Sequence, residues 1–335
     1  MNRVSTINLA CPICKVELIA QHQSYLCNRC GREYFCTESI PDLRVPTQIT
    51  PDAEQTLVQE LIEKYPFTEF QDMALLRVKS RQTTEQRKQK FANYNRTIKE
   101  RSTRFHSMFT RRIEQQWKIS NRHIALDIGC GIGPGILALA KEYDLVVGLD
   151  IHLSALLVAK KLIENEGLDN VILIQGSALA LPFADQQFDY IMAINVLEHI
   201  FEPDVTIAEV HRTLTIEGIF GADSRNRYDL FFPEPHVGLR WLGFLPRRWM
   251  EPYVQWRMGV NYDHTHLLSY WDLKRAAVRS FGQNWRVVLP DITAYGIESP
   301  LIHKLVEWAN NSWVKGWIRH LSPTHLLLTR RSIKG

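Results

Sequence analysis

The chain has little that would place it in a membrane or outside the cell. None of its 335 residues belongs to a run of roughly 18 or more uncharged apolar residues, the minimum for a membrane-spanning helix. The first ten residues also lack the apolar core of a signal peptide. We therefore expect a cytoplasmic protein without a transmembrane segment.

The excess of positive charge is small as well. The chain has 40 Lys and Arg against 36 Asp and Glu, a net charge of +4 that is mild for this length. This balance gives no whole-protein argument for nucleic-acid binding, so any basic partner surface must be local. With 45% hydrophobic and 23% charged residues, the chain is typical of a globular protein with one α/β domain and smaller additions.

The G-x-G-x-x-G fingerprint of dinucleotide-binding proteins is also missing. A glycine-dense stretch at 127–135 follows an apolar strand and precedes an apolar helix. Counting from Gly129 places Pro134 at the third glycine position, and counting from Gly131 places Ile136 there. What remains is an Asp-x-Gly-x-Gly-x-Gly turn, in which glycine permits positive φ angles and lets the backbone approach a ligand closely.

Further strands and helices alternate after this turn, which predicts a parallel sheet. The strand at 145–149 ends in Asp150, whose carboxylate can accept hydrogen bonds from two ribose hydroxyls. The strand at 171–174 leads to Gly176-Ser177-Ala178, and the strand at 188–195 leads to Leu197-Glu198-His199.

These ordered motifs resemble those of the class I S-adenosylmethionine (SAM) methyltransferases, in the branch that modifies small molecules and lipids. The resemblance implies an α/β fold, a Rossmann-like seven-stranded domain over residues 121–335 that ends in an antiparallel edge hairpin. Where the family usually has an acid bonding the adenine amino group, this chain has Ser177. The cofactor contacts implied by the resemblance are Asp127, Gly129, Gly131, Gly133, Asp150, Ser177, Ala178 and Asn195.

Four of the six cysteines form two C-x-x-C pairs, twelve residues apart: Cys11, Cys14, Cys27 and Cys30. Two such pairs can direct four thiolates at one zinc ion. Disulfides are the alternative, and the missing export signal disfavours them. Residues 1–46 resemble a Trm112-like zinc ribbon, in which a structural zinc ion would supply folding energy.

Residues 47–120 are expected to form a helical linker or cap, with a helix beginning at Thr50-Pro51. From Arg77 to Arg112 there are twelve Lys or Arg against Glu85 and Glu100 alone. We favour a solvated helix that covers the neighbouring domain. The alternative is a surface for RNA phosphates or for an anionic membrane, with a peripheral location at that membrane.

Residues 224–266 are expected to be an insertion over the substrate side, following a strand at 218–223. Aromatic residues beside paired arginines there suit an acidic amphiphile or a membrane interface, and equally suit packing against the core. Four histidines are candidates for a general base, because imidazole titrates near working pH, although they can also order a loop. They are His199, His236, His264 and His266.

The expected function is therefore SAM-dependent methyl transfer to a small-molecule or lipid-like acceptor, a reaction that depends mainly on alignment of the acceptor. One alternative is an rRNA or tRNA base methyltransferase, because a four-cysteine module before this fold resembles the large-subunit rRNA guanine methyltransferases. The other is a non-catalytic partner protein, because the ribbon resembles an activator of partner methyltransferases. The acceptor and the oligomeric state stay open.

Overall fold

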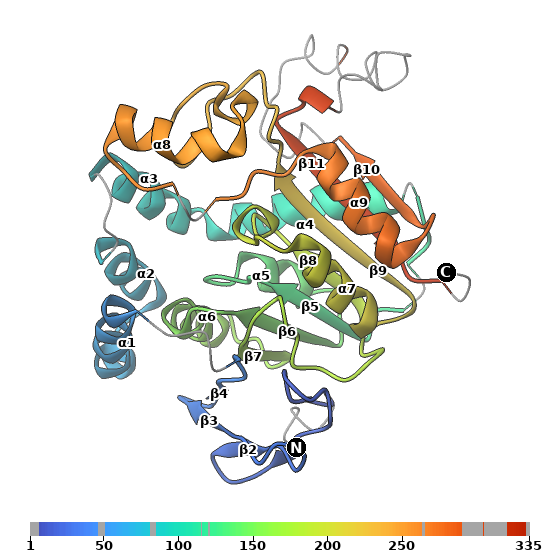
Figure 1. Cartoon of the computed structure of the whole chain (residues 1–335). Coiled ribbons are helices and arrows are strands. Elements are labelled where there is room, and N and C mark those ends of the chain that lie inside the picture. The colour runs from blue at the N-terminus through green and yellow to red at the C-terminus, as the bar shows by residue number, and fades with distance from the viewer. Residues whose placement is uncertain are drawn as a thin grey trace. The chain divides into compact units, whose positions relative to one another are not determined.

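The computed structural model describes residues 7–45, 51–80, 85–114, 116–119, 121–262, 265–289, 304 and 320–332 (Figure 1). The chain divides into two compact units. The first consists of residues 1–106, 120–192 and 212–216, and the second of residues 107–119, 193–211 and 217–335. In the ranges described, no helix is both long enough and apolar enough to cross a membrane.

The main sheet has seven strands in the order β10-β11-β9-β8-β5-β6-β7. β5 pairs with β6 and β6 with β7 in parallel, whereas β11 pairs antiparallel with both β9 and β10. This arrangement confirms the Rossmann-like seven-stranded fold and its antiparallel edge hairpin. The strands are β5 (Ile124–Ile128), β6 (Leu145–Asp150), β7 (Val171–Gln175), β8 (Phe188–Ala193), β9 (Leu214–Arg225), β10 (Trp285–Val288) and β11 (Thr324–Arg330).

The parallel strands of the first unit are apolar on both faces, as strands covered by helices on each side must be. Every residue of β6 is buried. The register pairs Ile128 with Leu149, so β5 and β6 end at the same edge. Gly148 lets helix α5 (Pro134–Leu139) pack closely, because a Cβ there would lie 2.6 Å from Ile136 Cδ1.

Helices α1 (Asp52–Lys64) and α2 (Phe70–Lys79) both pack against α6 (Leu153–Asn165) in the first unit (Figure 1). α1 begins at Asp52 with Pro51 as its N-cap, which corrects the expected start at Thr50-Pro51, and Thr50 itself lies outside the described residues. Ser154 lies in the first turn of α6, and its backbone N–H donates to Glu54 Oε1 at 3.1 Å. Because this partner comes from α1, local sequence could not reveal it.

The basic segment forms α3 (Glu85–Arg96) and α4 (Ile98–Glu114). The Arg101 side chain is buried, and its guanidinium carbon lies 3.1 Å from the centre of the Tyr94 ring. Lys99 pairs with Glu166 at 2.8 Å. Two of the positive charges thus contact groups of the first unit. Both the covering helix and the alternative surface for RNA or lipid stay predictions.

The N-terminal module has a four-stranded sheet of β1 (Ile19–Ala20), β2 (Ser24–Leu26), β3 (Glu33–Thr37) and β4 (Ile40–Pro41). This sheet is separate from the main sheet, and an isolated bridge attaches it to the end of β7. Asp42 forms a parallel bridge with Gln175, and Leu43 N donates to Gln175 O at 2.8 Å. A second attachment joins Ala10 N to Pro182 O at 2.9 Å. The module is therefore a built-in part of the first unit.

In the second unit, α9 (Tyr270–Phe281) covers β10 and β11 (Figure 1). The insertion contains the short helix η4 (Leu242–Phe244) and α8 (Arg247–Met258). It has a core of its own, made by Leu242, Met250, Val254, Tyr262 and Leu267. β9 begins at Leu214 and not at Gly218 as expected, because α7 (Pro203–Thr213) passes directly into the strand.

Gly135 generates a testable prediction about packing in the first unit. A Cβ at this position would lie 2.3 Å from Asp127 Oδ2 and 2.7 Å from Met192 Cε. We expect Gly135→Ala to lower the free energy of unfolding by about 1–3 kcal/mol in urea denaturation. In an ordinary helix the same change stabilises, by roughly 0.5–1 kcal/mol. A stability gain in Gly135→Ala would therefore contradict the close approach.

Candidate functional site

Three glycines bend the loop between β5 and α5 into the left-handed region, with φ of 65° at Gly129, 55° at Gly131 and 97° at Gly133. The backbone N–H groups of Gly129 and Cys130 both donate to Leu149 O at the end of β6, at 2.7 and 3.0 Å. A Cβ built on Gly131 would meet no atom within 4 Å. The loop is thus fixed on one side and open on the other, which leaves its peptide edge accessible to a ligand.

Asp150 ends β6 and ties the loop to the sheet. Its Oδ2 accepts the Gly131 N–H at 2.8 Å, and its Oδ1 accepts the His152 N–H at 2.9 Å. A carboxylate oxygen has two lone pairs, so each can still accept a hydrogen bond from a ligand. An oriented carboxylate with spare acceptors beside an open glycine loop is suited to a pair of vicinal hydroxyls such as those of ribose.

Asp127 occupies a different environment from Asp150. Its side chain is buried beneath the loop against Gly135. Burial, with a contribution from the charge of Asp150, raises the pKa of Asp127 well above its usual range. Both acids are buried, but only Asp150 has its two oxygens on backbone N–H groups of the loop and of the start of α6. Gly135 was not among the predicted site residues, although its place in the same glycine-rich stretch was a signal.

The turn after β7 is attached to the same strand end, because Gly176 N donates to Asp150 O at 2.9 Å. Ser177 is buried, and its Oγ accepts the Leu179 N–H at 3.2 Å, within its own turn. The first unit thus brings Ser177 and the adjacent Ala178 to the edge that carries Asp150. Asn195 belongs to the second unit, where its backbone N–H donates to Asp223 Oδ1 at 2.6 Å.

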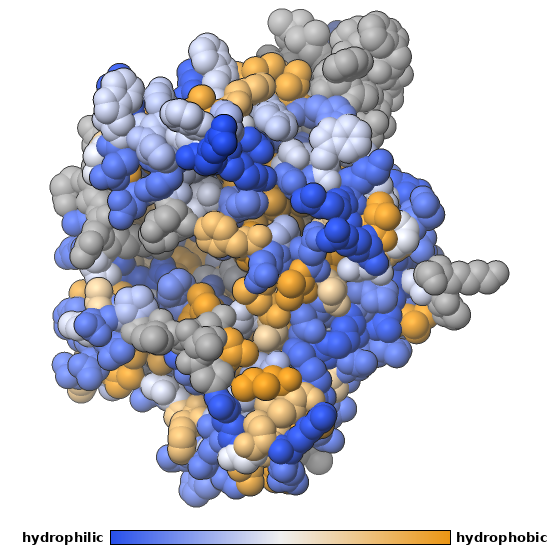
Figure 2. All heavy atoms as spheres, viewed as in Figure 1, coloured by the Kyte–Doolittle hydropathy of each residue, from blue (hydrophilic) through white to orange (hydrophobic). Residues whose placement is uncertain are grey.

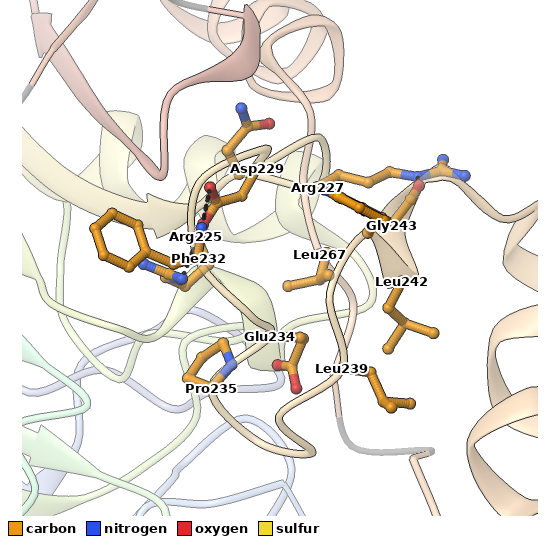
Figure 3. Close-up of a pocket in the computed structure, with 12 residues that line it drawn as sticks. Arg225, Arg227, Asp229, Phe232, Glu234, Pro235, Leu239, Leu242, Gly243 and Leu267 are labelled. Carbon is orange, nitrogen blue, oxygen red and sulfur yellow. Dashed lines mark hydrogen bonds and ion pairs between the residues drawn. The ribbon is translucent and has the colours of Figure 1, made fainter. Parts of the chain in front are cut away.

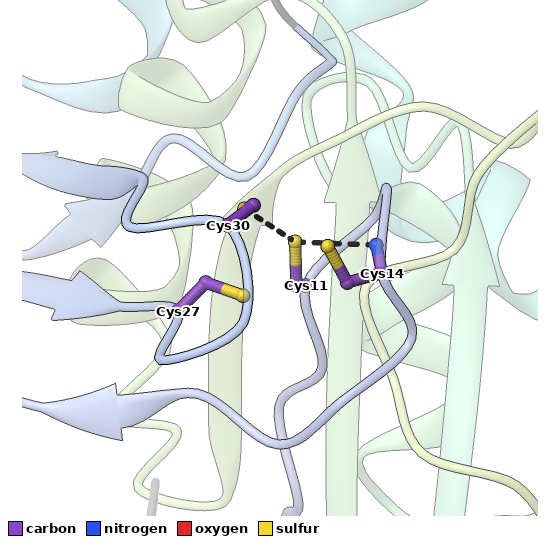
Figure 4. A group of neighbouring side chains, drawn as sticks. All are labelled: Cys11, Cys14, Cys27 and Cys30. Atoms are coloured by element: carbon purple, nitrogen blue, oxygen red, sulfur yellow. Dashed lines mark hydrogen bonds between the residues drawn. The ribbon is translucent and has the colours of Figure 1, made fainter.

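The four cysteines of the N-terminal module converge from two turns (Figure 4). Their Sγ atoms all lie within 4.8 Å of one another, and none is in a disulfide. Sulfurs in a tetrahedral zinc site, with Zn–S bonds of about 2.3 Å, are about 3.8 Å apart. The Sγ atoms of Cys11 and Cys30 are 3.9 Å apart. The donor set therefore fits zinc in both chemistry and spacing.

In the second unit, a buried carboxylate orients one of the predicted histidines. Glu234 Oε1 lies 2.5 Å from His236 Nδ1, and Glu234 Oε2 accepts the backbone N–H groups of His236 and Val237 at 2.7 and 2.8 Å. This geometry assigns the Nδ1 proton to the bond with Glu234 and leaves Nε2 as the basic nitrogen. The His199 ring stands edge-on to His236, with centroids 5.2 Å apart.

Glu234 also lines a pocket in the insertion. Figure 3 shows the Arg225–Asp229 ion pair, 3.1 Å long, on one side and leucines on the other. Arg227 closes one wall, since its Nε donates to Gly243 O at 2.8 Å. A Cβ on Gly243 would lie 1.7 Å from Arg227 O, so only glycine fits there. Sequence reasoning missed these residues, because no motif connects them.

Glu198 is a second functional candidate that sequence reasoning did not select, although it precedes His199. Only 1% of its surface is exposed, and Oε2 has no hydrogen-bond partner among the residues described. Burial, with the charges of Asp223 and Glu234 adding to it, raises the pKa of Glu198 to about 8. Burial likewise raises the pKa of Asp223 to about 6. An acid that keeps its proton near neutral pH can donate a hydrogen bond.

His266 is held by its backbone, which donates to Glu198 O at 2.6 Å, and its ring lies against Phe201. Burial chiefly, with Arg247 contributing, lowers the pKa of His266, so its imidazole is neutral at working pH. His264 lies outside the described residues. Of the four predicted histidines, the second unit brings the rings of His199 and His236 together, and Glu234 pairs with His236.

The raised pKa of Glu198 predicts a pH-dependent stability. Its carboxyl keeps its proton up to about pH 8 when folded but ionises near pH 4.5 when unfolded. The folded state therefore binds more protons in this window, and stability falls as pH rises through it. We expect Glu198→Gln to raise the free energy of unfolding at pH 9 by about 2–4 kcal/mol, and by much less at pH 5. The exposed Glu202→Gln is the control, and parallel pH profiles for Glu198→Gln and wild type would refute the assignment.

The sequence of this chain is similar to those of known methyltransferases. A family model described as a methyltransferase domain matches residues 126–222. The demethylmenaquinone methyltransferase of Geobacillus stearothermophilus is 28% identical over 175 residues, covering 51% of this chain and 72% of that protein. The ajmaline N-methyltransferase of Rauvolfia serpentina is 35% identical over 89 residues, covering 26% of this chain and 31% of that protein.

Among solved structures, the YcgJ protein of Bacillus subtilis aligns with a TM-score of 0.41 and 19% identity, over 63% of this chain and 92% of that one. The family match begins at Leu126 in β5 and ends at Ala222 in β9, so it includes the glycine loop, Asp150 and the turn after β7. The chain is thus a SAM-dependent methyltransferase of the class I fold.

Proposed function

We propose that this methyltransferase modifies a small-molecule or lipid-like acceptor, with His236 as the general base. The observation that carries the proposal is the Glu234–His236 pair, in which the carboxylate holds Nδ1 and leaves Nε2 basic. A hydroxyl or an acidic carbon must lose a proton when it is methylated, and a positioned imidazole can accept it. Relatives named for demethylmenaquinone and ajmaline support a small organic acceptor.

The residues of the first unit fit SAM. Asp150 would accept hydrogen bonds from the ribose hydroxyls, and the open edge at Gly131 leaves space for the adjoining part of the cofactor. Bound SAM supplies a methyl group on a positively charged sulfur, which is already a strong electrophile. The protein then has to align the acceptor and remove its proton. His236 Nε2 would take that proton, and the Glu234 carboxylate would stabilise the resulting imidazolium.

The test is a labelling experiment with methyl-labelled SAM and a cell extract split into RNA, lipid, protein and small-molecule fractions. We expect label in the lipid or small-molecule fraction. Label in RNA that ribonuclease removes would replace the proposal with the RNA base methyltransferase. SAM binding without label in any fraction would favour the non-catalytic partner protein.

Two variants separate cofactor binding from proton transfer. Asp150→Asn should weaken SAM binding about 10- to 100-fold in calorimetry, because a charged acceptor is lost. His236→Gln should leave SAM affinity unchanged and lower kcat about 100-fold or more. His123→Gln, at an exposed histidine that also pairs with a carboxylate, is the control. A kcat for His236→Gln equal to that of the control would remove the assigned base.

We also propose that Cys11, Cys14, Cys27 and Cys30 hold a structural zinc ion, which the spacing of their sulfurs supports. The purified protein should contain equimolar zinc by mass spectrometry. Cys30→Ser should lose the metal and unfold at a lower temperature, because the small module gains folding energy from it. Cys36→Ser, at a half-buried cysteine outside the cluster, should keep the metal. Equal zinc in both variants would rule out this ligand set.

A further inference from the structure

The outer face of α8 carries three exposed aromatic side chains. Trp249 is 57% exposed, Tyr253 37% and Trp256 78%. Their spacing of four and three residues places them in one stripe along the helix. Met250 and Val254, on the other side of the helix, are buried in the core of the insertion. The stripe is therefore the side of an anchored helix that the insertion does not cover.

The surroundings of the stripe are apolar too. Trp249, Tyr253 and Trp256 line a shallow open hollow together with Leu245, Pro246 and Pro252. Trp241 and Phe244, which precede the helix, are 60% and 46% exposed. Figure 2 shows this surface over α8 as mostly pale, with dark blue spheres beside it. A contiguous patch of exposed apolar surface often marks an interaction site.

The charge around the stripe is positive. Helical spacing of 100° per residue places Arg248 on one flank and Arg257 on the other, and both are exposed. Glu251 is the single acid of α8, and its carboxylate turns toward the insertion, where it accepts the Tyr262 N–H at 2.6 Å. Arg247 pairs with Asp272 at 3.0 Å. The charge that α8 presents outward is thus that of Arg248 and Arg257.

We propose that this aromatic stripe docks on an anionic lipid surface, with α8 lying parallel to the membrane plane. Trp and Tyr rings place their apolar bodies among acyl chains and keep the N–H or O–H at the level of the headgroups. Arginines on both flanks match lipid phosphates. Shallow insertion of a helix of this kind needs no deep groove, in agreement with the open hollow. The proposal does not depend on the methyl acceptor.

The test is flotation of the full chain with vesicles of phosphatidylcholine alone and of phosphatidylcholine mixed equally with phosphatidylglycerol. We expect binding to the mixed vesicles only, weakened by salt. The double variant Trp249→Ala, Trp256→Ala should bind at least about tenfold more weakly. Arg248→Gln and Arg257→Gln should each lose about fivefold. Trp271→Ala, at a tryptophan on α9 that is also 60% exposed, is the matched control.

Each other outcome overturns the proposal. Equal binding to both vesicles removes the role of anionic headgroups, and absence of binding removes the lipid surface altogether. Loss of binding in Trp271→Ala equal to that in the double variant shows a general effect of exposed tryptophan. A self-association that Trp256→Ala abolishes, without vesicle binding, assigns the stripe to a second copy of the chain. Thermal unfolding of each variant checks that the fold is intact. Because Trp256 is exposed, we expect its replacement to leave the fold unchanged.

Discussion

The glycine loop of this methyltransferase depends on two hydrogen bonds from backbone N–H groups to one carboxylate. Asp150 accepts them from Gly131 and His152, and so joins the glycine loop, the end of β6 and the start of α6 at one point. The loop can take this path only because its glycines adopt positive φ angles. Beneath it, Gly135 leaves room for the buried Asp127. The open edge of the loop follows from these contacts.

Backbone hydrogen bonds attach the four-cysteine module to the same unit. Its isolated bridge from Asp42 to Gln175 attaches the module to β7, and the turn after β7 is hydrogen-bonded to the strand end that carries Asp150. A module this small has little core of its own, so a bound metal would stabilise an element that the sheet already uses. This continuity favours a structural role for the cysteines in the catalytic chain itself.

The core of the insertion in the second unit fixes both the orientation of α8 and the segment that carries Glu234. Packing of Met250 and Val254 inward gives α8 a fixed orientation, and the aromatic stripe then faces outward. The same insertion places Glu234 where it orients His236 and lines a pocket. A rigid carboxylate next to an imidazole defines which nitrogen is basic, which a mobile loop would not do.

The sequence alone determined the features that depend on short spacing. Apolar runs located β5, β6 and β7, the glycine spacing separated the loop from a dinucleotide fingerprint, and two C-x-x-C pairs located the cysteine cluster. The tertiary structure decided what depends on segments far apart in the chain. Glu54 accepts a hydrogen bond from Ser154, and α7 runs directly into β9, so the strand begins at Leu214 and not at the predicted Gly218. His236 was one of four equal candidates until the fold placed it on Glu234, and Glu198 gained its raised pKa only by burial. Local patterns report which residues are near in sequence, whereas burial and partner choice arise only when distant segments pack.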